Sequence, residues 1–208
     1  MITQMKVKVC GMRDAENIRE VEALGIDMMG FIFWPKSSRY VSARPAYLPQ
    51  KCKRVGVFVD ATVDAIRQHI INYSLDIIQL HGHESPDFIR QIRLLCDDSI
   101  AIIKAFNIAT KEDLDTTAPY AGLADYFLFD TKGPSAGGNG EKFDWSILDT
   151  YHGDTPFLLS GGIGPDDAER IKSFHHPKCI GVDLNSRFEI EPGIKDIIKL
   201  KTFLNYGK

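Results

Sequence analysis

The chain has 208 residues, of which 25 are Lys or Arg and 28 are Asp or Glu, so its formal net charge is −3. This near-neutral balance argues against a protein that holds bulk nucleic acid or an anionic membrane by charge. No apolar run approaches the roughly 20 residues that span a bilayer, and the first residues lack the apolar segment of a secretory signal. We therefore expect a cytoplasmic globular protein with no nucleic-acid or membrane partner.

Strand and helix patterns alternate along the whole chain. Short runs rich in β-branched or aromatic residues predict eight strands, at 6–10, 28–33, 54–59, 76–80, 100–105, 125–130, 156–160 and 179–183. Between them, helical patterns lie at 15–24, 62–73, 86–95, 110–120, 165–174 and 193–204, with weaker candidates at 43–50 and 145–151. No composition shift marks a domain boundary, so we expect one domain over residues 1–208.

Strict alternation of strand and helix requires parallel strands, and eight of them predict a single-domain (β/α)8 barrel. An open doubly wound sheet is the alternative. It is disfavoured because no G-x-G-x-x-G follows the first strand, and because polar or reactive residues end most of the strands. In a barrel these carboxyl ends share one rim, which is where active sites are built.

Side-chain alternation along each strand predicts which residues face the barrel mouth. On the first strand Lys8 and Cys10 share one face, and Val7 with Val9 should meet the helices. The same rule pairs Gln79 with His81 on the fourth strand. Further candidates for the rim are Asp130 at the end of the sixth strand and Asp183 at the end of the eighth.

A glycine-rich turn after the seventh strand indicates a phosphate site. Residues 160–164 (SGGIG) lead directly into a helical pattern, and free backbone amides at such a place stabilise an anion. Gly161 and Gly162 are the candidate ligands here, and Asn185 and Ser186 after the eighth strand would complete the site. The implied ligand is a small phosphorylated molecule.

Cys10 and Asp130 are the candidate base and acid. A free Cys is often a small buried hydrophobe, but at the rim a thiolate is a competent base if a cation such as Lys8 lowers its pKa. Asp130 could be a turn cap or a general acid, and Asp183 could do the same work, so spacing alone leaves the choice open. Arg39 could bind a ligand carboxylate or remain solvated.

Metal and disulfide chemistry are not expected. The four cysteines, Cys10, Cys52, Cys96 and Cys179, form no C-x-x-C pair. His81 and His83 have no third candidate ligand nearby in the sequence, so no zinc site is predicted. The loop 133–140 (GPSAGGNG) has the composition of a mobile segment and is the candidate for a lid over the rim.

Several segments resemble the phosphoribosylanthranilate isomerase family over nearly the whole chain. They are KVCGM at 8–12, GFIFWPKSSRYVS at 30–42, VGVFVD at 55–60, IQLHG at 78–82, FLFDTK at 127–132, GGNGEKFDW at 137–145, LSGGI at 159–163, and VDLNSRFE with PGIKD within 182–196. The resemblance implies an isomerase of tryptophan biosynthesis that performs an Amadori rearrangement without a cofactor. It also implies Asp130 as general acid, Cys10 as thiolate base and Arg39 as the partner of the anthranilate carboxylate.

The resemblance further implies that Gly161, Gly162, Asn185 and Ser186 bind the phosphate, with Asp183, Gln79 and His81 lining the pocket. One departure is Arg187-Phe188 where the family usually has Gly-Val, so the phosphate ligands on this loop stay open. The rival functions are a related phosphoribosyl aldose–ketose isomerase, which normally uses two carboxylates, and a non-catalytic phosphosugar-binding barrel. A barrel of this size is compatible with a monomer or a homodimer.

Overall fold

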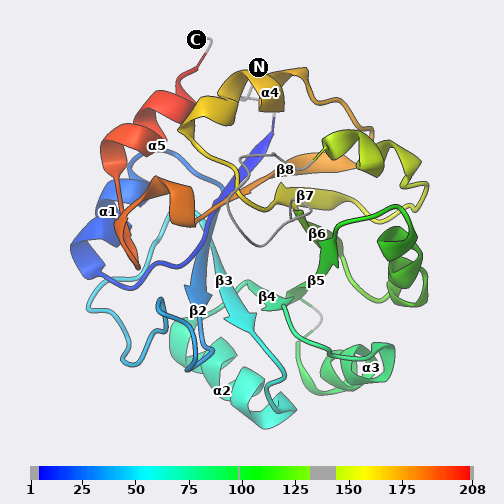
Figure 1. Cartoon of the computed structure of the whole chain (residues 1–208). Helices are drawn as coiled ribbons and strands as arrows, with labels where there is room; N and C mark the ends of the chain where they lie inside the picture. The colour runs from blue at the N-terminus through cyan, green and yellow to red at the C-terminus, as the bar shows by residue number, and fades with distance from the viewer. Residues whose placement is uncertain (1–4, 98, 132–143, 207–208) are drawn as a thin grey trace.

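The computed structural model describes residues 5–97, 99–131 and 144–206. Eight parallel strands form a closed barrel in which each strand pairs with the next in chain order and the last pairs with the first (Figure 1). They are β1 (Lys6–Val9), β2 (Met28–Ile32), β3 (Lys53–Phe58), β4 (Ile77–Leu80), β5 (Ala101–Ile108), β6 (Tyr126–Thr131), β7 (Phe157–Ser160) and β8 (Cys179–Leu184). The predicted (β/α)8 barrel is confirmed.

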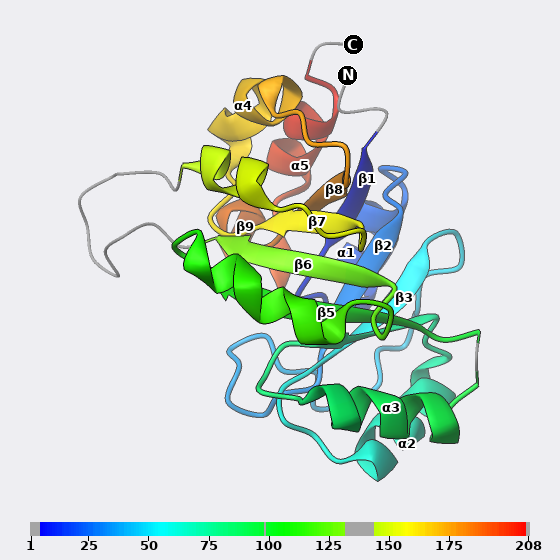
Figure 2. The same cartoon turned by 90° about the vertical axis from the view of Figure 1, so that its right-hand side faces the viewer.

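Helices surround the barrel (Figures 1 and 2). The α-helices are α1 (Ala15–Glu22), α2 (Val63–Tyr73), α3 (Pro86–Leu95), α4 (Ala168–Ser173) and α5 (Ile197–Leu204). The 3-10 helices are Glu112–Tyr120, Trp145–Thr150, Pro165–Asp167 and Ser186–Phe188. Within the described residues, no helix has the length and apolarity that a membrane span requires.

Side-chain caps fix where four of the helices begin. The side chains of Asp14, Thr62, Ser85 and Asp196 each accept a hydrogen bond from the backbone N–H three residues later. An oxygen at this position satisfies a helix donor that otherwise has no partner. These residue types were readable in the sequence, and the predicted starts of α1, α2 and α3 are accordingly right to within a residue.

The predicted helix at 43–50 is wrong, because no helix forms there. Pro45 and Pro49 lack backbone donors and disfavour helical geometry in the residue before each. The segment is instead held by Glu22 of α1, whose carboxylate accepts hydrogen bonds from the Tyr47 hydroxyl and from the backbone amide of Gln50.

The predicted helix at 193–204 starts too early. Its first residues belong to a two-stranded antiparallel hairpin of β9 (Glu189–Glu191) and β10 (Ile194–Lys195), and α5 begins only after Asp196. A tertiary contact imposes this, since the buried Asn17 side chain on α1 accepts from the Lys195 N–H at 2.7 Å and donates to the Lys195 carbonyl at 3.0 Å. Lys195 therefore adopts strand geometry instead of helical geometry.

The predicted helices at 110–120 and 145–151 are 3-10 helices rather than α-helices. The hydroxyls of Thr116, Thr117 and Thr150 each donate to the carbonyl three residues earlier, which favours the tighter turn. The pattern at 165–174 divides into a 3-10 turn and the short helix α4.

The core has two shells. The outer one packs the strands against the helices and includes Val7 and Val9, as side-chain alternation predicted. The inner one fills the barrel with seven apolar residues: Met28, Val55, Ile77, Ile103, Ala105, Leu128 and Leu158. Polar Lys8, Gln79 and Asp183 are buried as well, and they lie on the inner face at the carboxyl ends of their strands. The inner apolar shell thus ends at the level of these polar residues, near the carboxyl ends of the strands.

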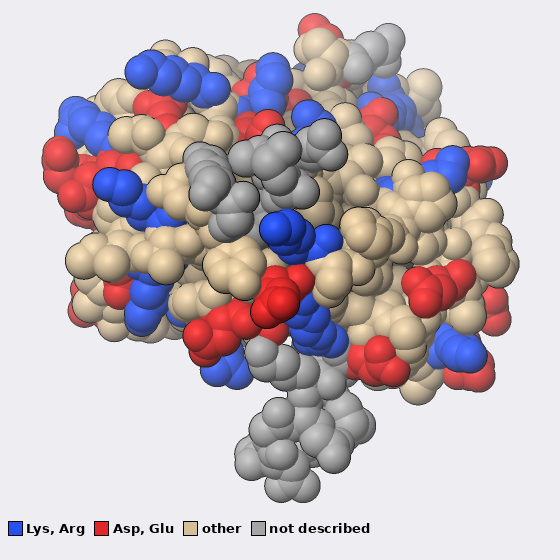
Figure 3. All heavy atoms as spheres, turned by 90° about the horizontal axis from the view of Figure 1, so that it is seen from above, with Lys and Arg blue, Asp and Glu red and all other residues tan. Residues whose placement is uncertain are grey.

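Charged side chains of both signs are interspersed on the face of the molecule shown in Figure 3. This agrees with the small net charge of the chain. No single-sign patch dominates that face, so its potential gives no preference for a polyanionic partner.

Candidate functional site

A cavity of about 190 Å³ opens at the carboxyl-terminal rim of the barrel. Nine of the ten site residues predicted from the sequence line it: Cys10, Gln79, His81, Asp130, Gly161, Gly162, Asp183, Asn185 and Ser186. Ile32, Val57, Ser160 and Ile163 complete the lining. Segments from strands β1, β4, β6, β7 and β8 therefore meet at one place, and Arg39 is the predicted residue that does not line it.

Cys10 lies directly after β1 with its thiol against β2. A Cβ on Gly30 would lie 2.6 Å from Cys10 Sγ, so this neighbour must be a glycine for the thiol to fit. Burial raises the pKa of the thiol above its usual range, while the charges of Lys8 and Lys195 lower it and that of Asp183 raises it. The predicted cation Lys8 is therefore present, but its effect on the pKa of the thiol is smaller than that of burial.

Lys8 is fully buried and forms an ion pair with Asp183 at 2.8 Å. Burial by itself would lower the pKa of this lysine, but the charges and hydrogen bonds of Asp183 and Cys10 raise it overall. A buried ammonium with such partners stays protonated. Asp183, which the sequence offered as an alternative acid, is thus the counter-ion of Lys8.

Asp130, His81 and Gln79 form a chain along the rim. The Gln79 amide Nε2 lies 2.7 Å from His81 Nδ1, and His81 Nε2 lies 3.6 Å from Asp130 Oδ2. If the amide donates, Nδ1 is the acceptor and the ring proton is on Nε2, facing Asp130. Gln79 Oε1 is buried and has no hydrogen-bond partner among the described residues. The Gln79 side chain lines the cavity, although this oxygen itself is not exposed.

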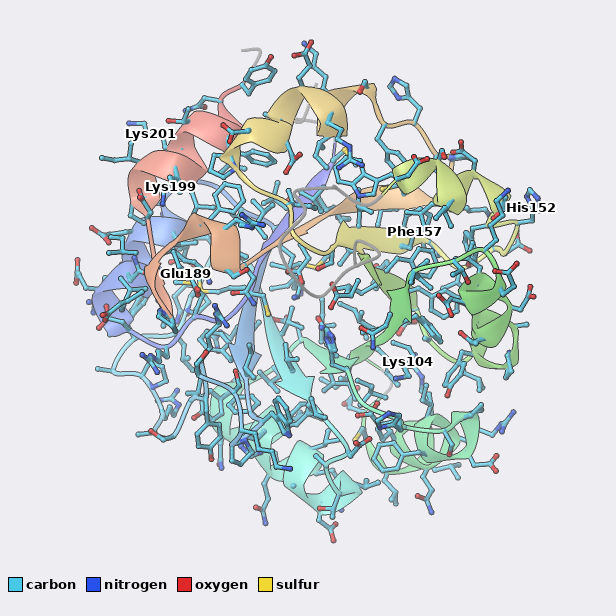
Figure 4. The ribbon with its side chains drawn as sticks, in the orientation of Figure 1. Lys104, His152, Phe157, Glu189, Lys199 and Lys201 are labelled. Atoms are coloured by element: carbon cyan, nitrogen blue, oxygen red, sulfur yellow. The ribbon has the colours of Figure 1, made fainter. Side chains whose placement is uncertain are left out.

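A buried ion pair supports the loop that carries His81. Lys104 Nζ donates to Glu84 at 3.0 Å and to the Gly82 carbonyl at 2.7 Å, and the Glu84 carboxylate accepts from the amides of Asp60 and Gly82 (Figure 4). The rim after β3 is thereby tied to the rim after β4. His83 points to solvent with its side chain 98% exposed, and the described residues contain no cluster of three or more metal-ligating side chains.

The glycine-rich turn after β7 borders the cavity, and one of its amides is bonded within the protein. Gly161 and Gly162 line the cavity, but the Gly164 amide is already bonded to Asp167 Oδ2 at 2.9 Å. The stem of Arg187 packs over Gly164, with Cβ and Cγ 3.6 and 3.7 Å from the place of a glycine Cβ. Arg187 is exposed and does not line the cavity, so its charge lies beside the site rather than in it.

Arg39 lies next to the cavity and is paired within the protein. Its Nε donates to both carboxylate oxygens of Glu189 at 2.8 and 3.0 Å, and its Nη2 lies 2.5 Å from Glu189 Oε2. One edge of the guanidinium is thus occupied by Glu189, a pairing that the sequence did not predict. Nη1 retains a longer contact of 3.4 Å to the Ser38 hydroxyl.

Sequence reasoning missed Glu189 and Lys195. Lys195 Nζ donates to Glu189 Oε1 at 2.6 Å and to Asn185 Oδ1 at 2.8 Å, and its side chain is fully buried. Both residues belong to the β9–β10 hairpin, of which only the part from Gly193 on, including Lys195, was predicted as the start of a helix. The available signal was a charged pair, Glu189 and Lys195, six residues apart around a Pro-Gly turn, which is typical of a hairpin.

Gly11 is the point on which this group converges. Its φ is +81°, and an added Cβ would lie 2.6 Å from Arg39 Cδ and 2.8 Å from Asn185 Oδ1. Gly11→Ala is expected to lower the free energy of unfolding by about 1–3 kcal/mol and to reduce kcat/KM, because Arg39 and Asn185 must shift. Thermal melting and steady-state kinetics measure the two effects.

Gly25→Ala is the matched control for this substitution. Gly25 has a similar φ of +77° but no atom within 4 Å of an added Cβ. Its substitution should therefore lower the free energy of unfolding through backbone strain alone, and kcat/KM should be retained. Wild-type kcat/KM in Gly11→Ala would contradict the crowding at Gly11.

Comparison with known proteins gives one family. Residues 7–206 match the family model described as N-(5'phosphoribosyl)anthranilate (PRA) isomerase. A protein of that name from Parabacteroides distasonis is 52% identical over 206 residues, covering 96% of this chain and 92% of the relative. Another from Phocaeicola vulgatus is 48% identical, covering 98% of both chains.

Solved structures agree. A phosphoribosyl anthranilate isomerase from Thermotoga maritima has a TM-score of 0.80 at 32% identity, covering 96% of this chain and 97% of that one. A phosphoribosyl anthranilate isomerase in complex with reduced 1-(o-carboxyphenylamino)-1-deoxyribulose 5-phosphate has a TM-score of 0.77 at 30% identity, covering 96% of both chains.

The loop 133–140, which the sequence offered as the candidate lid, lies outside the described residues.

Proposed function

Because the chain belongs to the N-(5'-phosphoribosyl)anthranilate isomerase family, we propose that it catalyses the Amadori rearrangement of N-(5'-phosphoribosyl)anthranilate in tryptophan biosynthesis. The product is 1-(2-carboxyphenylamino)-1-deoxyribulose 5-phosphate. The observation that carries the proposal is the meeting of Cys10, after β1, and Asp130, on β6, at a single cavity. An acid and a base on different strands of one rim can serve two positions of one sugar.

Asp130 is the general acid that opens the ring. Its carboxyl proton passes to the furanose ring oxygen, the bond from C1' to that oxygen breaks, and the anilino nitrogen lone pair forms the C1'=N double bond. The result is a protonated Schiff base, and Asp130 becomes a carboxylate. His81 Nε2, 3.6 Å from Asp130 Oδ2, stabilises this charge when its ring proton is on that nitrogen.

Cys10 is the base for the second step. Its thiolate takes the proton from C2', the electrons of that C–H bond form the C1'=C2' double bond, and the iminium electrons return to nitrogen. The resulting enolamine loses its hydroxyl proton and gains a proton at C1', which gives the ketone. The net change is an isomerisation that needs no oxidant or reductant.

The rest of the rim orients the substrate. Gly161, Gly162 and the Asn185–Ser186 segment bind the phosphate, a role supported by their place at the cavity and by the phosphorylated analogue in the complex of the related isomerase. Gln79 lines the cavity and orients His81 through the contact between its amide nitrogen and the ring. Asp183 acts through Lys8, to which it is paired.

Arg39 binds the anthranilate carboxylate through the guanidinium nitrogens that Glu189 leaves available. Arg39→Ala is expected to raise KM about 10- to 100-fold with a smaller change in kcat, because one charge-assisted hydrogen-bond pair is lost. Steady-state kinetics on the substrate tests this. Arg44→Ala, whose arginine bonds the Asn72 carbonyl on the surface, is the control, and an unchanged KM in Arg39→Ala would refute the pairing.

The assembly and location of the protein complete the proposal. We infer a cytoplasmic enzyme with a small phosphorylated substrate that acts as a monomer or a homodimer. The isomerase of Thermotoga maritima is described as dimeric, with monomers generated from it. Sedimentation at several concentrations distinguishes the two states for this chain.

Product analysis tests the reaction itself. The protein is incubated with phosphoribosylanthranilate generated in place, with EDTA present, and the mixture is followed by NMR. The expected result is loss of the anomeric C1' signal and appearance of a C1' methylene group beside a C2' ketone carbon. Substrate that is unchanged, or cleaved to free anthranilate at the uncatalysed rate only, would contradict the proposed function.

A further inference from the structure

Three cations and one carboxylate interact electrostatically with the thiol of Cys10: Lys8, Arg39, Lys195 and Asp183. A second carboxylate, Glu189, forms ion pairs with Arg39 and Lys195. Asp130 and His81 face the same cavity from β6 and from the rim after β4. Among these five charged groups, three are cations and two are carboxylates, so this cluster carries one excess positive charge when the thiol is protonated.

The unmatched charge does not belong to Lys8. Its ammonium is paired with Asp183 at 2.8 Å, and the effects of these two groups on the thiol have opposite signs. At the other end of the cluster, a single carboxylate, Glu189, is shared between Arg39 and Lys195. One anion facing two cations leaves an excess of positive charge beside Cys10.

The β9–β10 hairpin delivers Lys195 to this place. Lys195 and Glu189 are cross-strand partners in the hairpin, so their side chains share one face. Asn17 holds the backbone of Lys195 on both its N–H and its carbonyl. The ammonium ends 3.4 Å from the place of a Cβ on Gly11, the residue next to Cys10.

We propose that Lys195 is a positioning residue that stabilises the thiolate of Cys10, and that Glu189 limits this effect by holding the same ammonium. A buried cation gains stability from each added anion, and among the described residues the Lys195 ammonium has two hydrogen-bond partners where its geometry allows three. Burial and the nearby Arg39 charge lower the pKa of Lys195, while Glu189 and Cys10 act to raise it. The inference rests on the proposed role of Cys10 as base.

The test compares Lys195→Gln, which loses the charge but keeps hydrogen-bond donors, with Lys195→Arg, which keeps the charge. The readout is the alkylation rate of Cys10 by iodoacetamide as a function of pH, measured by mass spectrometry of the peptide that contains it. Lys201→Gln is the control, because Lys201 is exposed on the outer helix α5 (Figure 4).

In Lys195→Gln the pH midpoint of alkylation is expected to rise by about one unit, which is a tenfold smaller thiolate fraction at a given pH below it. Higher intrinsic nucleophilicity offsets part of this, so the rate at pH 8 falls about threefold. Lys195→Arg and Lys201→Gln should stay near the wild-type midpoint. An unchanged midpoint in Lys195→Gln, in a protein that melts cooperatively, would overturn the inference.

Glu189→Gln is expected to shift the pH midpoint of Cys10 alkylation in the opposite direction. It replaces Lys195→Gln in the test if that variant does not fold. Removing the shared carboxylate leaves Arg39 and Lys195 without their anion, so the midpoint should fall. A midpoint that stays or rises overturns the inference. General damage to the site would not give opposite shifts in the two variants.

This experiment is separate from the test of the reaction, because alkylation needs no turnover. If Cys10→Ala retained activity, the proposed role of Cys10 as base would be wrong. The measured pH dependence of Cys10 alkylation would still hold. An active wild type whose Lys195→Gln titration is unchanged would remove only the role of Lys195.

Discussion

Cys10→Ala is expected to lower kcat by about 10²–10⁴-fold. The thiolate is the group that removes the C2' proton, and the alanine offers no base in its place. Because Sγ fits against the backbone of Gly30, the smaller alanine fits without rearrangement. Binding of the reduced product analogue, measured by calorimetry, should stay within a few fold of wild type.

Cys96→Ala is the control for the loss of a thiol. Cys96 caps the end of α3, away from the rim cavity, and should tolerate the change without loss of turnover. A Cys10→Ala protein with kcat within tenfold of wild type would show that another group is the base.

Asp130→Asn is expected to have an effect of similar size for a different reason. The amide keeps the shape of the carboxyl group but carries no acidic proton for the ring oxygen, so ring opening falls by about 10²–10⁴-fold. The contact with His81 at 3.6 Å can persist because the Asn oxygen accepts. Steady-state kcat measures the loss, and affinity for the reduced product analogue reports that the site is intact.

Asp64→Asn is the corresponding control, since Asp64 is exposed on α2. If Asp130→Asn turned over at a rate close to wild type, the acid would have to be sought elsewhere on the rim. Asp183 is then a poor substitute, because its carboxylate is committed to Lys8.

Sequence periodicity was sufficient for the barrel. Alternation along β1 placed Val7 and Val9 against the helices and Lys8 with Cys10 inside, and each observation follows from the two-residue period of a strand. The rim residues were predictable for the same reason, since the carboxyl ends of parallel strands must converge once the barrel closes. Local rules therefore found nine of the ten proposed residues at the cavity.

The long-range contacts that hold the residues around the rim were not predictable in this way. Arg39 and Glu189 are 150 residues apart in the chain, and Asn17 and Lys195 are 178 apart. Neither pair leaves a local signature, and the contact of Asn17 with Lys195 is what overrides the helical pattern that begins at Gly193. Charge balance around Cys10 is likewise a property of three separate segments, so only the folded chain displays it.

Trapping the reaction between its two steps tests the division of labour between Asp130 and Cys10 most directly. Substrate is mixed with excess Cys10→Ala or Asp130→Asn, quenched with borodeuteride, and the position of the label is determined by mass spectrometry beside an enzyme-free sample. The account predicts deuterium at C1', from the trapped Schiff base, in Cys10→Ala, and a label no greater than in the enzyme-free sample for Asp130→Asn. Equal C1' labelling by the two variants, or C2' labelling of a ketone in Cys10→Ala, would contradict it.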